Sequence, residues 1–81
     1  MKTTRYFDYT RNRPDRKRIK DEWILSAVGA PVQEHVQADG RIRRWTWVKE
    51  EGKFLRVILL DDGETIHNAF FDRDFKEETK P

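Results

Sequence analysis

Four glycines divide this sequence at nearly equal intervals, and their spacing constrains the fold more than any other feature. They are Gly29, Gly40, Gly52 and Gly63, separated by 11, 12 and 11 residues. The last three each follow an acidic residue, and this pairing is typical of tight turns because glycine adopts positive φ without steric cost. The segments between them are rich in β-branched and aromatic residues. We therefore predict three hairpins joining four strands near 32–38, 41–49, 53–60 and 64–71.

The first 30 residues have the spacing of helices rather than of strands. Aromatic residues at positions 6, 7 and 9 favour a short helix over 3–13, which Thr3 or Thr4 can cap. Pro14 disfavours helix at the preceding residue, so a break is expected there. A second apolar stripe with helical spacing ends before Pro31, and its members are Ile19, Trp23, Ile24, Ala27 and Val28. The sequence does not mark clearly where the first helix ends and the second begins within 14–20, so one kinked helix is an alternative to two helices.

These elements predict an α+β fold in which two short N-terminal helices pack on a four-stranded antiparallel meander sheet. The 81 residues are expected to form a single domain, 1–81. Its parts are a helical, basic N-terminal part at 1–30, an antiparallel sheet at 32–71 and a charged tail at 72–81. Hydrophobic residues make up only 36% of the chain, so the core is thin and depends on good packing or on a partner.

The composition argues against several classes of site. There is no cysteine, so neither a disulfide nor a thiolate metal site is expected. The two histidines, His35 and His67, lie on different predicted strands without a clear third ligand, and we expect no metal and no other cofactor. No apolar run approaches the roughly 20 residues that a membrane span needs, and the N-terminus lacks the apolar stretch of a signal peptide. A cytoplasmic protein without membrane contact is therefore expected.

Positive charge is concentrated at the N-terminus. Residues 1–20 carry a net charge of +6 and residues 21–81 a net charge of −4. A basic end on an acidic body indicates contact with a polyanion such as RNA, or with an acidic partner. Solvated charge around the start of a helix is an equally compatible explanation. The candidate contact residues in this part are Arg13, Arg16, Lys17 and Arg18.

Two-residue turns at 51–52 and 62–63 predict which side chains share a face of the sheet. The face covered by the helices then carries Thr46, Val48, Leu55, Val57, Leu59, Ile66 and Phe70. The opposite face carries Trp45, Trp47, Phe54, Arg56, Ile58, His67 and Phe71. This second face is exposed, buried by a partner or packed by the C-terminal tail. A two-residue turn at 39–40 places Val32 and Val36 with the tryptophans, whereas a bulge or a longer turn reverses that.

The strongest candidates for chemistry lie on this second face. In the predicted register Trp47 is opposite Arg56, and His67 is diagonal to Arg56. Aromatic rings among basic residues can stack bases and hold phosphates, and a histidine near an arginine can act as acid or base in phosphodiester cleavage. The catalytic candidates are His67, Arg56 and Arg73. The alternative is that the aromatic residues are core and that arginine beside tryptophan is a packing pair.

A second basic group lies beside the first predicted hairpin. It comprises Arg41, Arg43 and Arg44, and with Trp45 and Trp47 it forms the second set of candidate contacts for nucleic acid or a partner. Arg43 is expected to share a face with Trp45. Charges at a sheet edge also prevent aggregation, which is an equally good explanation. At the end of the last strand, Asp72 and Arg73 form a possible ion pair.

Several stretches resemble a group of small uncharacterised bacterial proteins, notably from cyanobacteria. They are RPDRKRIKDEWI at 13–24, Ala30-Pro31, DGRI at 39–42, LRVI at 55–58 and HNAFFDRDFK at 67–76, and the resemblance covers roughly residues 4–76. That group is in turn similar in layout to the RelE/BrnT-like superfamily of type II toxins. Two features depart from the toxin pattern, because an N-terminal strand is missing and the basic surplus precedes the sheet.

The resemblance implies a small ribonuclease that cleaves messenger RNA and is neutralised by an antitoxin. In that superfamily basic residues on the sheet, often with a histidine or tyrosine, carry the reaction, and Arg56, His67 and Arg73 lie in comparable places. The leading hypothesis is therefore a toxin-like ribonuclease of a toxin–antitoxin system. The alternative is a non-enzymatic module that binds a protein, a second copy of itself as a dimer, or nucleic acid. The sequence leaves open whether the protein is an enzyme.

Overall fold

The computed structural model describes residues 1–77 as two helices and one four-stranded sheet. In chain order the elements are α1 (Arg5–Thr10), α2 (Asp21–Gly29), β1 (Gln33–Val36), β2 (Ile42–Val48), β3 (Lys53–Leu59) and β4 (Ile66–Phe71). Neighbouring strands are antiparallel, and their order across the sheet is their order along the chain. The predicted α+β fold with its antiparallel meander is confirmed. The end of the predicted charged tail, 78–81, lies outside the described residues.

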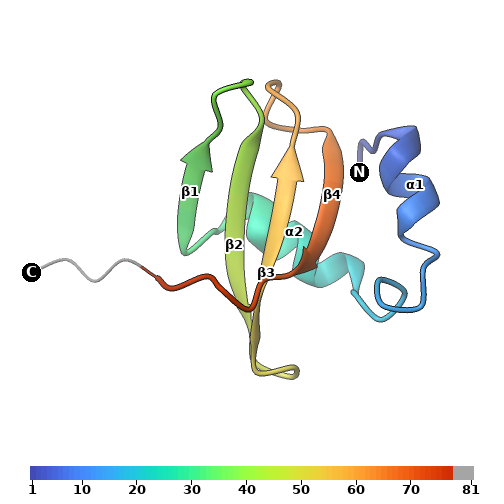
Figure 1. Cartoon of the computed structure of the whole chain (residues 1–81), viewed down its shortest axis with the longest axis vertical. Coiled ribbons are helices and arrows are strands. Elements are labelled where there is room, and N and C mark those ends of the chain that lie inside the picture. The colour runs from blue at the N-terminus through green and yellow to red at the C-terminus, as the bar shows by residue number, and fades with distance from the viewer. Residues whose placement is uncertain (78–81) are drawn as a thin grey trace, which may run out of the picture.

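The helices occupy one side of the sheet and one of its edges. α2 lies behind β2 and β3, whereas α1 lies beside β4, which is an edge strand (Figure 1). Among residues 1–77, neither helix has the length and the apolar run that crossing a bilayer takes. Because α2 lies behind the sheet and α1 lies beside it, no helix of the described residues 1–77 covers the front face.

Local sequence explains where these elements begin and end. Thr4 caps α1, because its hydroxyl oxygen accepts a hydrogen bond from the backbone N–H of Phe7 at 3.1 Å. α2 begins at Asp21, with an acidic first turn that suits the positive end of the helix dipole. Residues 11–20 form turns rather than helix, so α1 and α2 are separate helices. The hairpin glycines have φ of 90°, 62° and 70° at Gly40, Gly52 and Gly63, as the glycine spacing predicts.

The hydrophobic core lies between α1, α2 and the back face of the sheet. Leu55, Val57 and Leu59 of β3 are fully buried and face the helices. The helices contribute Phe7, Trp23, Ile24 and Ala27, while Val48, Ile66 and Ala69 complete the sheet side of the same cluster. The alternation along β3 is therefore the one that the sequence predicts.

The register between β2 and β3 differs from the predicted one by two residues. Val48 pairs with Lys53 across a four-residue loop, so Trp45 rather than Trp47 lies opposite Arg56. The predicted two-residue turn is wrong because the backbone N–H of Gly52 donates to the carbonyl of Val48, which closes a longer turn. Because the slip is an even number of residues, the face assignments in β2 and β3 are unchanged.

The register between β3 and β4 inverts part of the prediction. Leu59 pairs with Ile66 as expected, but Ile58 pairs with Asn68, so a bulge lies at His67. The N-terminal segment explains the bulge, because Ile66 exchanges backbone hydrogen bonds with residues 2 and 4 and forms a parallel bridge with Thr3. Beyond the bulge the faces are reversed.

The predicted face assignments of Phe70 and Phe71 are therefore wrong. Phe71 packs against the core, with its ring centroid 6.2 Å from that of Trp23, whereas Phe70 faces the front. In the first hairpin the turn spans 37–41 and pairs Val36 with Ile42, which is the longer-turn alternative. Val36 consequently lies on the side of the helices and not with the tryptophans.

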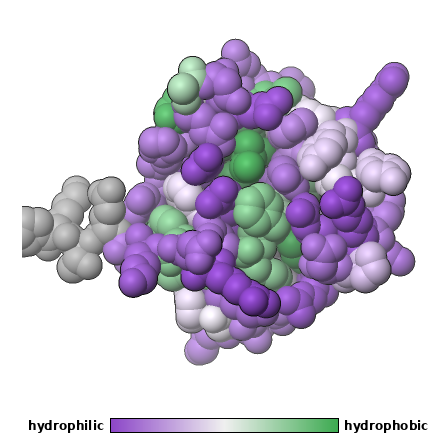
Figure 2. Space-filling view, in the orientation of Figure 1, coloured by the Kyte–Doolittle hydropathy of each residue, from purple (hydrophilic) through white to green (hydrophobic). Residues whose placement is uncertain are grey.

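The C-terminal segment covers part of the front face. It leaves β4 and crosses in front of the lower part of the sheet (Figure 1). Its Phe75 ring stacks on Trp45, with centroids 4.5 Å apart, and contacts Phe54 edge-on at 4.9 Å. On this face apolar side chains reach the surface in patches among polar ones (Figure 2). The second face was expected to be exposed, buried by a partner or packed by the C-terminal tail. Around Trp45 it is packed by the tail.

Candidate functional site

A row of alternating cations and aromatic rings crosses the front face. The guanidinium of Arg16 lies 5.3 Å from the centre of the Phe70 ring, and that of Arg56 lies 5.0 Å from the same ring. Arg56 also lies 5.6 Å from the Trp45 ring, on which Phe75 stacks. We call these five residues the cation–aromatic strip. It joins the loop before α2 to the C-terminal segment, two parts of the chain that are far apart in sequence.

Asp72 organises the centre of the strip. One carboxylate oxygen accepts from Trp45 Nε1 at 3.0 Å and from Arg56 Nε and Nη2 at 2.9 and 2.6 Å. The other oxygen accepts from the backbone N–H of Asp74 at 3.1 Å. Burial raises the pKa of this carboxyl, but the hydrogen bonds from Trp45 and Arg56 and the charge of Arg56 outweigh burial, so the pKa lies below its usual value. Asp72 is therefore ionised at neutral pH.

This ion pair corrects two sequence-based assignments. Asp72 pairs with Arg56 and not with its neighbour Arg73. Arg56, expected as a catalytic candidate, has its guanidinium engaged by a carboxylate that is 9% exposed. The sequence did not predict the central role of Asp72. A weak signal was present, because an acidic residue directly after a strand can pair with an arginine of the neighbouring strand. The residues alone did not say which arginine it would reach.

An open groove of about 370 Å³ borders the strip on the front face. Trp45 and Phe75 form its apolar wall, and His35, Arg43 and Lys76 contribute positive or titratable groups. Arg43 shares this face with Trp45, as expected, and its Nε donates to Gln37 Oε1 at 2.7 Å. Trp47 lies farther along β2, where it is 49% exposed and contacts Phe54 edge-on at 4.9 Å.

A second groove, of about 250 Å³, lies where the loop before α2 meets the end of β4. We call it the basic groove, defined by Arg16, Arg18, Lys53 and Arg73 around the rings of Phe70 and Phe71. Arg18 and Lys53 lie 5.4 and 5.5 Å from the centre of the Phe71 ring. The single acidic residue that lines it is Asp15. The predicted contact residues Arg16 and Arg18 therefore meet the catalytic candidate Arg73 here.

The cations of the basic groove are held to different degrees. Arg16 is fixed to β4, since its Nη1 donates to Asn68 Oδ1 at 2.7 Å and to the carbonyl of Ala69 at 3.4 Å. Arg18 lies 3.6 Å from a carboxylate oxygen of Glu51. Within residues 1–77, neither Lys53 nor Arg73 forms an ion pair. The groove thus has one anchored arginine and outer cations that are available to an anion.

His67 lies apart from both grooves. Its Nδ1 is hydrogen-bonded to Thr4 Oγ1 at 3.1 Å, and its ring stacks on Tyr6 of α1 with centroids 4.9 Å apart. The prediction that His67 is a diagonal neighbour of Arg56 is wrong because of the bulge. The three catalytic candidates consequently have three different sets of neighbours: His67 contacts α1, Arg56 is bound to Asp72, and Arg73 lines the basic groove.

The remaining candidate contact residues are dispersed. Arg44 lies on the helix side, where it donates to Glu34 Oε1 and to the carbonyl of Val28, both at 2.9 Å. Arg41 is exposed in the first hairpin, 3.9 Å from Asp39. Arg13 and Lys17 are exposed in the same loop as Arg16 and Arg18. None of these four residues lines either groove.

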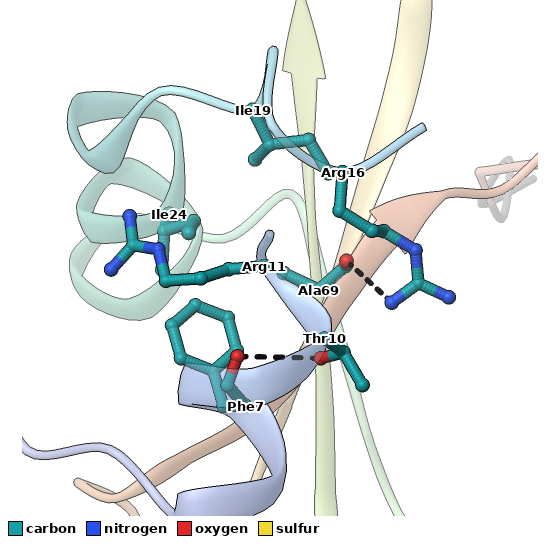
Figure 3. Close-up of a pocket in the computed structure, with 7 residues that line it drawn as sticks. All are labelled: Phe7, Thr10, Arg11, Arg16, Ile19, Ile24 and Ala69. Carbon is teal, nitrogen blue, oxygen red and sulfur yellow. Dashed lines mark hydrogen bonds between the residues drawn. The ribbon is translucent and has the colours of Figure 1, made fainter. Parts of the chain in front are cut away.

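A small cavity lies beneath this loop and is part of the packing. Its volume is about 10 Å³, room for roughly one water molecule. Figure 3 shows Phe7 and Ile24 on its apolar side and the Arg16 guanidinium turned outward to the carbonyl of Ala69. It is too small for a ligand. Within residues 1–77, no three metal-ligating side chains gather in one place.

No protein-family model matches the chain, and neither a curated protein nor a solved structure matches it. The resemblance to RelE/BrnT-like toxins therefore stays a prediction. What the site can do follows from its geometry alone.

The pKa of His67 provides a test of this arrangement. Burial lowers it first and the positive charge of Arg41 lowers it further, so we expect titration below the ordinary value of about 6.5. Because the unfolded chain then binds the proton more readily, the contribution of His67 to stability is present above pH 6.5 and falls as the pH drops below it. An NMR titration of the imidazole should show the low pKa, and Arg41→Gln should raise it. An unchanged value in Arg41→Gln would contradict the proximity of the two charges.

Proposed function

We propose that this protein binds single-stranded nucleic acid, with RNA as the first ligand to test, through the basic groove and the adjoining cation–aromatic strip. We propose further that it does not cleave the strand. The observation that supports this most is the composition of the basic groove. Four cations lie around two phenylalanine rings, and one carboxylate, Asp15, lines the same groove. Arginine and lysine bind backbone phosphates, and aromatic rings stack on bases.

The arrangement of charge favours an anionic ligand over a purely structural role. Like charges that gather in one groove repel each other, so a fold gains no stability from those cations that no carboxylate matches. Arg56 is matched by Asp72 and Arg44 by Glu34, and at the groove Arg16 lies 3.4 Å from Asp15 and Arg18 lies 3.6 Å from Glu51. Lys53 and Arg73 have no such match within residues 1–77. Phosphate groups would supply the missing negative charge.

The aromatic residues favour a single strand over a duplex. Phe70 lies both in the basic groove and in the strip, so a ligand bound at the groove reaches the front face through it. Bases can stack on protein side chains only when they are not already stacked and paired in a duplex. A strand with splayed bases would therefore use the rings, and a duplex would use the cations alone.

Binding without cleavage accords better with the positions of the catalytic candidates. Phosphodiester cleavage requires a proton-transfer group close to the cation that stabilises the phosphate. His67 has its ring against Tyr6 and a nitrogen bonded to Thr4, while Arg56 is neutralised by Asp72. Arg56 and Arg73 both lie near Phe70, but His67 shares none of the contacts described above with either of them. The ribonuclease remains the outcome that an RNA cleavage assay tests.

We expect Arg73→Gln to weaken RNA binding about threefold to fivefold at low salt, equivalent to up to about 1 kcal/mol. The loss of one phosphate contact should also reduce the slope of log affinity against log salt by about 0.7, the value for a single strand. Fluorescence anisotropy with a labelled single-stranded RNA of about 10 nucleotides measures both quantities. Lys53→Gln should have a similar effect, and the double variant a larger one.

Arg5→Gln is the matched control, since Arg5 is an exposed arginine of α1 outside both grooves. It changes the net charge equally and should leave affinity nearly unchanged. Equal effects of Arg5→Gln and Arg73→Gln, or binding that does not depend on salt, would count against the proposal. The same RNA should stay intact on a denaturing gel. RNA fragments that the wild type produces and His67→Ala does not would establish a ribonuclease instead.

A further inference from the structure

The contact between Phe75 and Trp45 differs from the other phenylalanine contacts of the fold. Their rings are nearly parallel, with an interplanar angle of 15° and centroids 4.5 Å apart. Three other pairs that include a phenylalanine have interplanar angles between 59° and 73°. They are Trp23–Phe71, Trp47–Phe54 and Phe54–Phe75. A parallel stack at this distance is the arrangement that a nucleobase adopts on an indole ring.

We propose that Trp45 is a stacking site for one nucleobase of the bound strand, and that Phe75 occupies this site in the free protein. The inference rests on the proposed function and names the part of the ligand that the front face takes. Trp45 is 5% exposed in the free protein because the C-terminal segment lies over its face. The base would replace Phe75 on the indole, and the segment would move away.

The segment that would move is held by few contacts. Its Asp74 N–H donates to Asp72, and Phe75 contacts two rings. Among residues 73–77, no side chain takes part in an ion pair within the described part of the chain. A purine base has a larger ring system than phenylalanine, and any base can stack on an aromatic side chain. Exchange of Phe75 for a base therefore breaks few contacts.

The platform itself stays in place when the segment leaves. Trp45 is held at the edge of its ring by the hydrogen bond from its Nε1 to Asp72, and Asp72 is held by Arg56. These contacts precede Phe75 in the chain and do not depend on it. The indole is thus pre-oriented, which lowers the entropic cost of binding a base.

The charges around the open groove agree with this exchange. Arg43 and His35 border the groove from β2 and β1 and would remain beside the base. The carboxylate of Asp72 is neutralised by Arg56. Asp74 and Lys76 line the groove from the segment itself, so one negative and one positive charge would leave with Phe75. Opening therefore leaves the net charge of the groove unchanged and leaves Arg43 beside the phosphate backbone.

Truncation after Asp74 tests the proposal. It removes Phe75 together with two lysines and two glutamates, so the net charge does not change. We expect single-stranded RNA to bind about fivefold more tightly, which corresponds to about 1 kcal/mol and to a site that is free about one fifth of the time in the intact chain. Phe75→Ala in the full chain should give the same gain. Truncation after Glu77 is the matched control, because it keeps Phe75, is also charge-neutral and should leave affinity unchanged.

Tryptophan fluorescence locates the effect. In a Trp47→Phe background the remaining indoles are Trp45 and the core residue Trp23, whose Nε1 donates to Glu50. Stacking of a base on Trp45 should quench the emission when RNA is added, and the quench should appear at lower RNA concentration after truncation at Asp74. Binding without any quench would overturn the stacking site.

The possible outcomes separate this inference from the proposed function. Salt-dependent binding by the intact protein with no gain on truncation, or with weaker binding, would overturn the inference and leave the function standing. Weaker binding would mean that Phe75 is itself part of the site. Absence of binding by both the intact and the truncated protein would overturn both. Circular dichroism of each variant excludes loss of the fold as the cause.

Discussion

Replacing Asp72 with alanine is expected to reduce the free energy of unfolding by about 2–3 kcal/mol. The substitution leaves the Arg56 guanidinium and the Trp45 indole N–H without their acceptor in a largely buried position. Removing one partner of a buried ion pair costs about 3–5 kcal/mol, and the partial exposure of Arg56 lowers that figure. Urea unfolding followed by tryptophan fluorescence measures the change.

Asp74→Ala is the matched control for Asp72→Ala. Asp74 is an exposed aspartate two residues later, and its loss should change the stability by less than about 0.5 kcal/mol. If both variants lose the same stability, Asp72 does not organise the strip. Asp72→Asn keeps the size of the side chain and should lie between the two.

The same ion pair predicts how stability depends on pH. The folded pKa of Asp72 lies below its unfolded value of about 3.9, so its contribution is complete above pH 3.9 and is lost as the pH falls through the folded pKa. Asp62, in the last hairpin, acts in the same direction, since hydrogen bonds from Thr65 and Glu64 lower its pKa to about 2. Wild-type stability should thus fall more steeply below pH 4 than that of Asp72→Asn. If the stability of both proteins fell equally with pH, Asp72 would not cause the steeper loss in the wild type.

Leu55→Ala is expected to have the largest effect, a loss of about 3–4 kcal/mol. Leu55 is 0% exposed at the centre of β3, between the sheet and the helices, and the mutation leaves a cavity that the surrounding side chains cannot fill. A domain of this size has about 4–12 kcal/mol of stability in total. The variant should therefore melt at a much lower temperature and bind RNA only when it is folded.

Leu25→Ala provides the comparison within the same chain. Leu25 lies on α2 but is 53% exposed, so the same change should alter stability by less than about 0.5 kcal/mol. Thermal unfolding of the two variants under identical conditions measures the difference. Similar melting temperatures would mean that the helices cover a different face of the sheet.

Much of the fold could be predicted because its signals are local. Glycine after an acid marked the three hairpins, since positive φ is a property of the residue itself. The alternation in β3 identified Leu55, Val57 and Leu59 as core, because side chains on a strand alternate between faces. Thr4 was one of two expected caps for α1, and the structure selects it.

The candidate site could be predicted only in part, and apart from the shifted register of the second hairpin the failures have one cause. Arg43, Trp45 and Arg56 were expected on one face, and they lie there. His67 was expected beside Arg56 and is instead held by α1, while Phe70 replaces Phe71 on the front. Arg16, expected as a contact of a basic arm, proved to connect that arm to β4. Each error follows from contacts between segments that are distant in the chain.

The sequence by itself determined the order of elements, the antiparallel meander and the core face of its central strand. These depend on turn residues and on a period of two, which act within a few residues. Only the tertiary structure decided the bulge at His67, the partner of Asp72 and the meeting of Arg16, Arg18 and Arg73. Backbone hydrogen bonds from the N-terminal segment to Ile66 produce the bulge, and the path of the chain after β4 brings Asp72 to Arg56. Such contacts depend on how separate segments pack together, and no local pattern specifies them.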